Sequence, residues 1–296
     1  MKHILMLGVF LLFQAMSAAA LAAADPTHIL IVVGPTNHPP GTHEVAASGR
    51  LMADCLQRAS NLSGVVKAEV VTALPQDQAT LDRYASVVFI GDNFPLTQMP
   101  DAPASMSRFA AMMARGCGIV CVHFAVGLQA KDLPDDGAHQ LLYWLGGYFA
   151  VRAKHHQSVA KIFPSATIEP ATVTHPICNG WTTFTLHDEP YINLWWGGEH
   201  YRPSTRVTPI ASSLLPPEKP QRETVAWATE RSNDGRGFGI VMPHFYRNWA
   251  NADLRRCIMN GIIWSAQLEV PAGGVVTADP DLQRYEPSAL EPKATK

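Results

Sequence analysis

Several features that mark common protein classes are missing from these 296 residues. The formal net charge is -2 and no run of like charges occurs, so the chain lacks the basic footprint of a nucleic-acid-binding protein. The five cysteines are an odd number without C-x-x-C spacing, which supports neither a disulfide scaffold nor a zinc ribbon. We therefore expect no nucleic acid partner, and small or neutral ligands are favoured.

Phosphate-binding and metalloprotease motifs are missing as well. The segment 34–56, GPTNHPPGTHEVAASGRLMADCL, follows an apolar run but has neither the glycines of G-x-G-x-x-G nor a P-loop lysine. Neither H-E-x-x-H nor H-x-H occurs, so a metal site has to be assembled from distant segments, with His and Glu ligands. A divalent metal such as zinc is therefore one interpretation of the histidines, and no cofactor is certain.

Residues 1–24 have the pattern of a secretory signal peptide. A short basic start is followed by an apolar stretch and then by small residues, with Ala20-Leu21-Ala22 and Ala22-Ala23-Ala24 as candidate cleavage sites. The apolar stretch is shorter than the roughly 20 residues that a spanning helix needs, which disfavours the alternative of a retained anchor. We expect export to the periplasm or the extracellular space, with no membrane attachment after cleavage.

The rest of the chain predicts an α/β fold, and its apolar fraction of 47% is ample for a large core. Uninterrupted apolar strands separated by helices favour a parallel sheet covered by helices on both faces. Strands are expected at 28–33, 66–71, 86–92, 118–124, 223–229 and 237–245, and helices at 43–62, 103–115 and 251–266. An alternating run at 155–163 opens a partly antiparallel insertion. We place one domain at 27–268 and a loosely ordered tail at 269–296.

Polar side chains cluster where the expected parallel strands end, which is where open α/β sheets bind ligands. The candidates for binding, catalysis or metal ligation are Asn37, His38, His43, Glu44, Asp92, Asn93, His123 and His244. One histidine alone is usually structural, but several at one edge favour a site. Two structural alternatives stay open: Glu44 complements a helix dipole, and Pro39 and Pro40 only stiffen a connector.

The insertion contributes the sequence LHDEPYINLWW at 186–196, an acidic pair followed by aromatic residues. If this segment is a strand, His187 and Glu189 share one face and Asp188 takes the other. Aromatic side chains there are expected either to line a sugar site or to pack a local core. They are Tyr191, Trp195, Trp196 and Tyr201.

Cys121 is not predicted to be a nucleophile. A nucleophile elbow such as G-x-S-x-G needs small residues two positions on either side, and Ile119 and His123 stand there. Cys121 is therefore expected to be a packing residue inside a strand, with His123 as the residue that reaches the sheet edge.

Taken in order, these motifs resemble the ThuA-like (trehalose utilisation) family. The resemblance rests on NHPPGTHEVAASGRLMADCL, GCGIVCVHF, THPI, DEPY and GRGFGIVMPHFYRNW with the ending NGIIWSA, and it covers residues 27–268. It implies a flavodoxin-like, class I glutamine amidotransferase-like fold without the amidotransferase nucleophile. The segments around His123 and around His244 depart from the commonest family versions.

The resemblance also implies carbohydrate metabolism, often beside a dehydrogenase that oxidises a sugar at C3. A 3-keto-glycoside has an acidic proton next to its carbonyl, so a base and a stabilised oxyanion suffice for elimination, hydrolysis or isomerisation. Our hypothesis gives the acid-base work to His123, Glu189 and His244, with His38, His43 and His123 as candidate metal ligands. The remaining candidates bind the sugar: Asn37, His43, Glu44, Asp92, Asn93, Asp188, Tyr191 and Trp195. A non-catalytic periplasmic sugar-binding protein and a metal-dependent hydrolase of ordinary substrates are the alternatives.

Overall fold

The structure of the protein is a computed structural model, which describes residues 25–94, 101–198 and 203–292. Its main element is a nine-stranded mixed sheet. The strand order is β2-β1-β3-β4-β11-β10-β9-β7-β8. The first five strands of this order are parallel to one another: β2 (Val66–Val71), β1 (Thr27–Val33), β3 (Tyr84–Ile90), β4 (Gly118–Val122) and β11 (Arg236–Ile240). This half has the order of a flavodoxin-like sheet, in which the chain reverses its direction of progress at β1. The expected α/β fold is confirmed.

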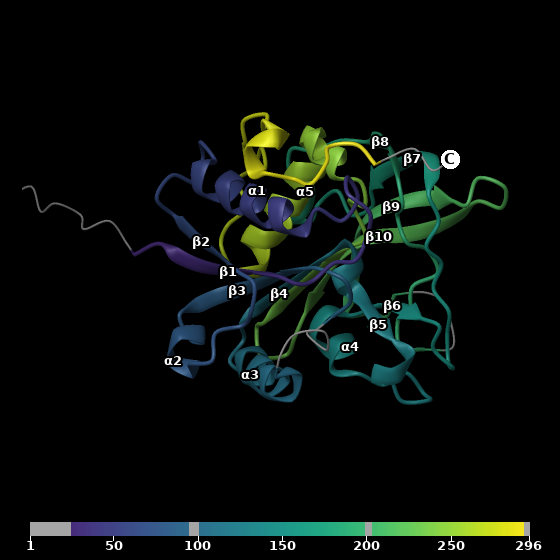
Figure 1. Ribbon diagram of the computed structural model, residues 1–296, viewed down its shortest axis with the longest axis horizontal. Helices are drawn as coiled ribbons and strands as arrows, with labels where there is room; N and C mark the ends of the chain where they lie inside the picture. The colour runs from purple at the N-terminus through teal and green to yellow at the C-terminus, as the bar shows by residue number, and fades with distance from the viewer. Residues whose placement is uncertain (1–24, 95–100, 199–202, 293–296) are drawn as a thin grey trace, which may run out of the picture.

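Helices cover both faces of the parallel half, as the apolar strands predict. In Figure 1, α1 (Val45–Arg58) and α5 (Ala252–Ser265) lie on one face, and α2 (Gln78–Leu81), α3 (Ala102–Ala114) and α4 (Gln140–Leu145) lie on the other. The helix α5 begins as expected, because the Asn251 Oδ1 accepts the N–H of Leu254 at 2.9 Å. Strands β1, β3 and β4 are buried between these layers.

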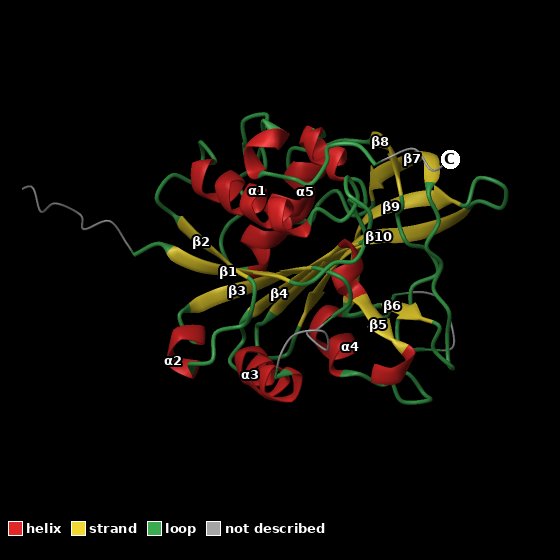
Figure 2. Cartoon of the chain, viewed as in Figure 1, coloured by secondary structure: helices red, strands yellow, loops and turns green. Residues whose placement is uncertain are grey.

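The other half of the sheet is antiparallel and is formed by β10 (Gln221–Glu230), β9 (Val207–Leu215), β7 (Phe163–Pro170) and β8 (Phe184–Asp188). Figure 2 shows these strands extending beyond the helical layers. Strand β10 joins β11 through a short turn that leaves no room for a crossover helix, so the two pair antiparallel. The expected strand at 155–163 is wrong, because β7 begins only at Phe163 and the preceding residues make a single bridge, between Val159 and Ile192.

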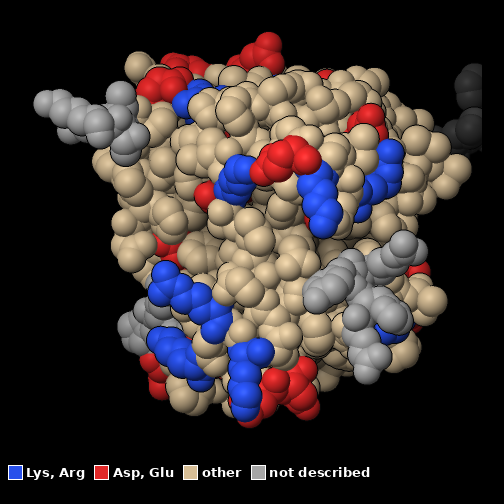
Figure 3. Space-filling model, turned by 90° about the vertical axis from the view of Figure 1, so that its right-hand side faces the viewer, with Lys and Arg blue, Asp and Glu red and all other residues tan. Residues whose placement is uncertain are grey.

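Charged side chains of both signs are interspersed over the face at the antiparallel end, which is otherwise mostly uncharged (Figure 3). Two ion pairs tie the antiparallel end together on the surface: Lys161 with Glu218 at 2.6 Å and Arg222 with Glu169 at 3.1 Å. Their side chains are about half exposed, so each pair contributes little to stability. Within the described residues, no helix combines the length and the apolarity that crossing a bilayer requires.

Short elements complete the chain. They are the parallel pair β5 (Gly127–Gln129) and β6 (Phe149–Val151), with the 3-10 helices η1 (His123–Val126), η2 (Ala130–Asp132), η3 (Pro176–Cys178), η4 (Tyr246–Ala250) and η5 (Leu282–Tyr285). All five cysteines are buried free thiols. Cys121 lies fully buried in β4, in agreement with a packing role.

The C-terminal segment differs from the loose tail expected at 269–296, because its described part packs along α1 and the loop before it. Tyr285 is buried and its hydroxyl donates to Asp54 on α1 at 2.7 Å. The Tyr246 hydroxyl donates to the carbonyl of Leu282 at 3.0 Å. The sequence predicted a loose tail because Pro, Ala and Gly are frequent there. A few separate residues, such as Leu282 and Tyr285, make the contacts that hold the segment. We call residues 286–292 the strap.

Candidate functional site

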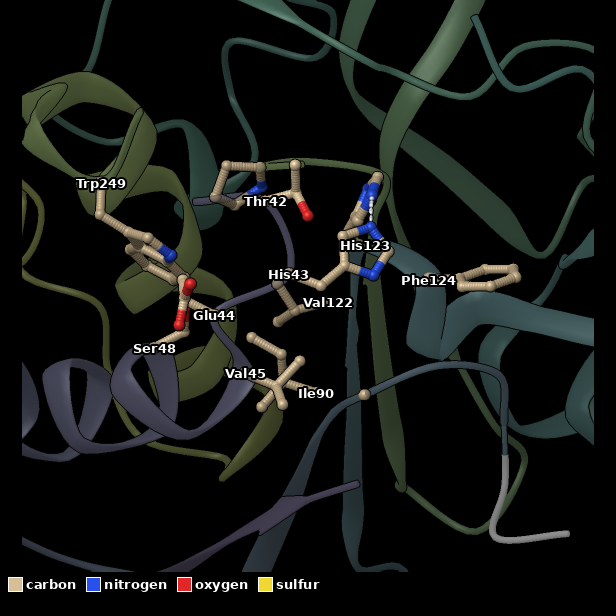
Figure 4. A pocket seen from close by; sticks show the side chains of 12 residues that line it. Thr42, His43, Glu44, Val45, Ser48, Ile90, Val122, His123, Phe124 and Trp249 are labelled. Carbon is tan, nitrogen blue, oxygen red and sulfur yellow. Dashed lines mark hydrogen bonds between the residues drawn. The ribbon is translucent and has the colours of Figure 1, made fainter. Parts of the chain in front are cut away.

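Side chains from four strand ends meet at the carboxyl edge of the parallel sheet, beside the point where the strand order reverses. The loop after β1 supplies His43, the end of β3 supplies Asp92, the end of β4 supplies His123, and the segment after β11 supplies His244. Figure 4 shows His43 and His123 facing each other across this edge. His123 has a φ of +51°, a left-handed conformation that is unfavourable for a residue with a side chain and is typical of functional constraint.

Three imidazoles bring one nitrogen each to a common point, and we call His43, His123 and His244 the histidine triad. The Nε2 atoms of His43 and His123 are 2.9 Å apart. The Nδ1 of His244 is 3.0 Å from the first of these atoms and 3.2 Å from the second. Nitrogens bound to a tetrahedral zinc ion lie about 3.3 Å apart, given Zn–N bonds of about 2.0 to 2.1 Å. All three residues are buried.

The outer nitrogens of His43 and His123 have partners that fix the tautomers of these two residues. The Nδ1 of His43 is 2.7 Å from Asp92 Oδ1, and the Nδ1 of His123 is 2.9 Å from the carbonyl oxygen of Val241. Because both partners only accept, each Nδ1 carries the proton and each Nε2 presents a bare lone pair to the common point. Lone pairs facing one another need a cation or a proton between them, and such outer contacts are usual around metal-binding histidines.

Burial keeps the triad uncharged at neutral pH. It lowers the pKa of His123 well below its ordinary value, and the neighbouring imidazoles lower it further. Burial, followed by the same mutual repulsion, lowers the pKa of His244 to about 3. The pKa of His43 is also lowered by burial, against the opposing effect of its bond to Asp92. Neutral imidazole is the form that binds a metal, so the buried triad could hold one.

His38 lies outside the triad, next to His43. Its ring stacks on that of His43 with a centroid distance of 3.5 Å, and its Nδ1 is 2.8 Å from Asp92 Oδ2. One carboxylate therefore holds two imidazoles, and hydrogen bonds with both histidines are among the causes that lower the pKa of Asp92. Asn37 contributes its backbone N–H to the same carboxylate at 3.0 Å. His38, His43 and Asp92 form a second group with possible ligand atoms, but those atoms are already paired with one another.

The acidic pair at the end of β8, Asp188 and Glu189, lies against His244. The Oδ1 of Asp188 accepts the backbone N–H groups of His244 and Phe245 at 2.9 and 3.2 Å, so this fully buried carboxyl holds the segment that carries His244. The Oε2 of Glu189 is 3.3 Å from His244 Nδ1. Burial, with the nearby charge of Asp188, raises the pKa of Glu189 to about 7, and burial raises that of Asp188 to about 6. His187 faces elsewhere and contacts Arg247.

Replacing Glu189 with glutamine is expected to stabilise the metal-free protein at pH 8. The folded carboxyl binds its proton more tightly than the unfolded one, whose pKa is 4.5, so wild-type stability falls as the pH rises from 4.5 to about 7. The loss is of the order of 2 to 3 kcal/mol. Urea unfolding of chelator-treated wild type and variant, measured from pH 4.5 to 8, checks this. A difference between the two that is independent of pH would contradict it.

Aromatic rings close one side of the triad. Tyr191 stacks on His123 with a centroid distance of 4.6 Å and packs at a tilt against Phe149 at 4.2 Å. Phe124, which the sequence did not single out, meets the rings of His38 and His43 edge to face. Its position next to His123 in the chain was the available signal. This side of the site is therefore closed by aromatic groups.

Other sequence candidates lie away from the triad. Trp195 packs on His155 and His156 and pairs with Tyr148 through the backbone. Trp196 is buried and packs on Trp227. Tyr201 lies outside the described residues, as do residues 1–24. Asn93 follows Asp92 in a left-handed conformation, and its buried Oδ1 has no hydrogen-bond partner within 25–94, 101–198 and 203–292.

Glu44 has a structural role in this arrangement. Its carboxylate accepts the backbone N–H of Gly41 at 2.7 Å and those of Ser288 and Ala289 in the strap at 2.8 and 3.2 Å. Helix α1 begins at Val45, so Glu44 stands at its N-cap without capping it through the side chain. The proposed first-turn position of His43 and Glu44 is therefore wrong, because both residues precede the helix.

A small cavity lies behind the triad, between the loop after β1 and the first turn of α1. Ser48, Ile90 and Trp249 are among the residues that line it, and Figure 4 shows Trp249 on the wall opposite His123. Its volume of about 10 Å³ is room for no more than about one water molecule. A ligand larger than a water molecule therefore has to approach from the other side, where His38 and Glu189 keep 27% and 17% of their side chains exposed.

Comparisons with known proteins agree with this architecture. Residues 30–265 match the model of a family described as ThuA: Trehalose utilisation. No curated protein matches the sequence. The structure of a ThuA-like protein from Bacteroides uniformis is similar, with 16% identity and a TM-score of 0.59 over 84% of this chain and 95% of that one. At this identity the likeness shows the fold alone.

Two more distant structures resemble the fold. The carbohydrate deacetylase Agd3 is 12% identical with a TM-score of 0.45, over 82% of this chain and 32% of that one. The glutaminase domain of CTPS from Trypanosoma brucei, solved with bound acivicin, is 8% identical with a TM-score of 0.45, over 84% of this chain and 97% of that one.

Proposed function

Because the chain belongs to the ThuA family, described by trehalose utilisation, we propose that it is an enzyme that acts on a keto-sugar, in particular a 3-keto-glycoside. The reaction begins with abstraction of the proton next to the carbonyl. The observation that carries this proposal is the position of Glu189, a carboxyl with its pKa raised to about 7, 3.3 Å from the histidine triad.

Glu189 has the properties of a general base for carbon acids. A base works best when its pKa lies near the working pH, since it is then both partly ionised and strong enough to take a proton. Proton removal next to a ketone also needs charge stabilisation at the carbonyl oxygen. The sequence hypothesis shared acid-base work between His123, His244 and Glu189. The geometry favours Glu189, because His123 and His244 face the common point within 3.2 Å.

A divalent metal fits the triad, and zinc is the ion whose ligand preference matches three neutral imidazoles. When bound, it supplies a Lewis acid that polarises a carbonyl oxygen. The protein's own residues supply the rest: Asp92 orients His43, Asp188 fixes the backbone of His244, and Glu189 holds or releases the proton. After proton removal, either the C1–O bond breaks and the leaving oxygen takes up the proton held by Glu189, or that proton returns at another carbon.

The substrate of such a reaction has to be supplied by an oxidation. An unmodified glycoside has a hydroxyl at C3, and only its oxidation makes the neighbouring proton acidic enough for a carboxyl base. We therefore propose functional pairing with a sugar 3-dehydrogenase. We also propose that residues 1–24 direct the chain to the periplasm or the extracellular space, so that the reaction with the keto-sugar takes place there.

Isotope exchange tests the proposal directly. Methyl 3-keto-α-glucoside is incubated in D₂O with the zinc-loaded protein, and loss of the C2 proton signal is followed by NMR together with release of methanol. We expect exchange, and Glu189→Gln should slow it by at least about 100-fold. Glu223→Gln is the control, since Glu223 is another partly buried carboxyl with a raised pKa, and its bond is to the N–H of Asn193.

The alternatives give different results in the same assay. A metal-dependent hydrolase of ordinary substrates would release methanol from methyl α-glucoside, without oxidation at C3 and without exchange. A sugar-binding protein would raise its unfolding temperature with either sugar and turn over neither. Unchanged exchange in Glu189→Gln would remove Glu189 from the role of base.

A further inference from the structure

Tyr191 places a hydroxyl at the histidine triad that the roles assigned above do not use. Its ring is buried, stacked on His123 and packed at a tilt against Phe149. Its hydroxyl oxygen is 3.1 Å from the Nε2 of His123, the same atom that faces His43 and His244. The hydroxyl therefore lies next to the point at which the three imidazole nitrogens meet.

The direction of this hydrogen bond follows from the tautomer of His123. Since Nδ1–H of His123 donates to the carbonyl of Val241, its Nε2 accepts, and the Tyr191 hydroxyl donates to it. A cation held by the triad would take that lone pair. The buried hydroxyl would then lose its acceptor, and a buried donor without a partner is costly. Because the ring is packed against His123 and Phe149, the O–H would have to turn to another acceptor nearby.

We propose that Tyr191 is a catalytic residue that donates a hydrogen bond to the carbonyl oxygen of a sugar bound at the triad. This inference rests on the proposed function and deepens it, because it adds a donor to the oxygen that gains charge as Glu189 takes the proton. Hydrogen bonds aimed at such an oxygen are a main source of rate enhancement. It also predicts selection for ligands with an oxygen acceptor.

A hydrogen-bond donor and a metal ligand are chemically different roles for this hydroxyl. A donor keeps its hydrogen and needs an acceptor, whereas a ligand oxygen binds the ion directly. The donor role and the ligand role therefore make opposite predictions for metal affinity.

The test uses cobalt(II), whose visible absorption reports its coordination, in wild type and in Tyr191→Phe. We expect the two to bind cobalt within about threefold of each other. Acetate, an oxygen donor with a second acceptor, should bind the cobalt-loaded variant about 10-fold more weakly than the wild type. Imidazole has no oxygen to accept a bond, so it should bind both equally.

Tyr148→Phe is the matched control. It removes another buried tyrosine hydroxyl, one that donates to the carbonyl of Gly137, and should change neither affinity. Both variants keep the aromatic ring, so we expect them to fold. Circular dichroism and the unfolding temperature check this.

Each other outcome overturns the inference in a distinguishable way. Equal acetate binding in wild type and Tyr191→Phe removes the donor role alone, and the proposed metal site stands. A loss of cobalt affinity of more than about 30-fold in Tyr191→Phe makes the tyrosine a ligand instead. Failure of the wild type to bind cobalt removes the metal from the proposed function and the inference with it.

Discussion

Replacing His123 with asparagine is expected to lower the zinc affinity of the protein by at least about 100-fold. Zinc sites with four ligands bind with roughly 10 to 16 kcal/mol, or about 3 kcal/mol for each ligand, and 1.4 kcal/mol corresponds to a factor of ten. Asparagine tolerates the left-handed backbone at this position. Its amide can keep a bond to the Val241 carbonyl, so the substitution removes Nε2 with little other change.

Competition with a chromophoric chelator measures the affinity. The control is His28→Ala, because His28 lies on β1, where its Nδ1 is 3.5 Å from Glu69 and its ring meets Tyr84. That variant should bind zinc as the wild type does. Equal zinc affinity in His123→Asn and wild type would show that the triad does not hold the ion.

Replacing Gly41 with alanine is expected to cost about 3 kcal/mol of stability, much more than a glycine substitution in an ordinary turn. Gly41 has a φ of +86°, and an added Cβ would lie 2.4 Å from the backbone carbon of Glu291 in the strap. The left-handed backbone accounts for about 1 to 2 kcal/mol, and overpacking against backbone adds about 1 to 3 kcal/mol.

A double-mutant cycle separates the two contributions. Gly64 has a φ of +75° and open space around the position of a Cβ, so Gly64→Ala measures the backbone strain alone. Deleting residues 287–296 removes the backbone that the new methyl group meets. In the deleted protein, Gly41→Ala should cost no more than Gly64→Ala does, as measured by urea unfolding. If the deletion leaves the cost of Gly41→Ala unchanged, the strap does not contact the loop.

The fold and the membership of the site could be predicted from sequence to a useful degree, for a physical reason. Apolar strands separated by helices determine a parallel sheet, and the carboxyl ends of parallel strands converge. That placed His43, Asp92, His123 and His244 at one edge, where the structure has them. Glu189 was identified because it forms an acidic pair with Asp188 in the sequence. The predicted alternation of faces along a strand does not apply to it, because β8 ends at Asp188.

The pairings within the site were beyond reach of the sequence. The Asp92 carboxylate contacts both His38 and His43 because the loop after β1 lies over the end of β3. The path of that loop depends on backbone geometry, which the sequence pattern does not give. Glu44 was predicted to bind substrate, but its partners Ser288 and Ala289 lie more than 240 positions later in the chain. Trp195 was placed in the site from composition, and its pairing with Tyr148 turns it elsewhere.

The strap and the loop that it contacts lie far apart in the sequence. A chain emerges N-terminus first during synthesis, so the loop with His38 and His43 exists long before the residues that hold it. Arg247 anchors Glu291 at 2.6 Å, and Glu44 receives its last two hydrogen bonds only when residues 288 and 289 arrive. A chain clipped before residue 288 would therefore keep the histidines but lack the two hydrogen bonds from the strap to Glu44, next to His43.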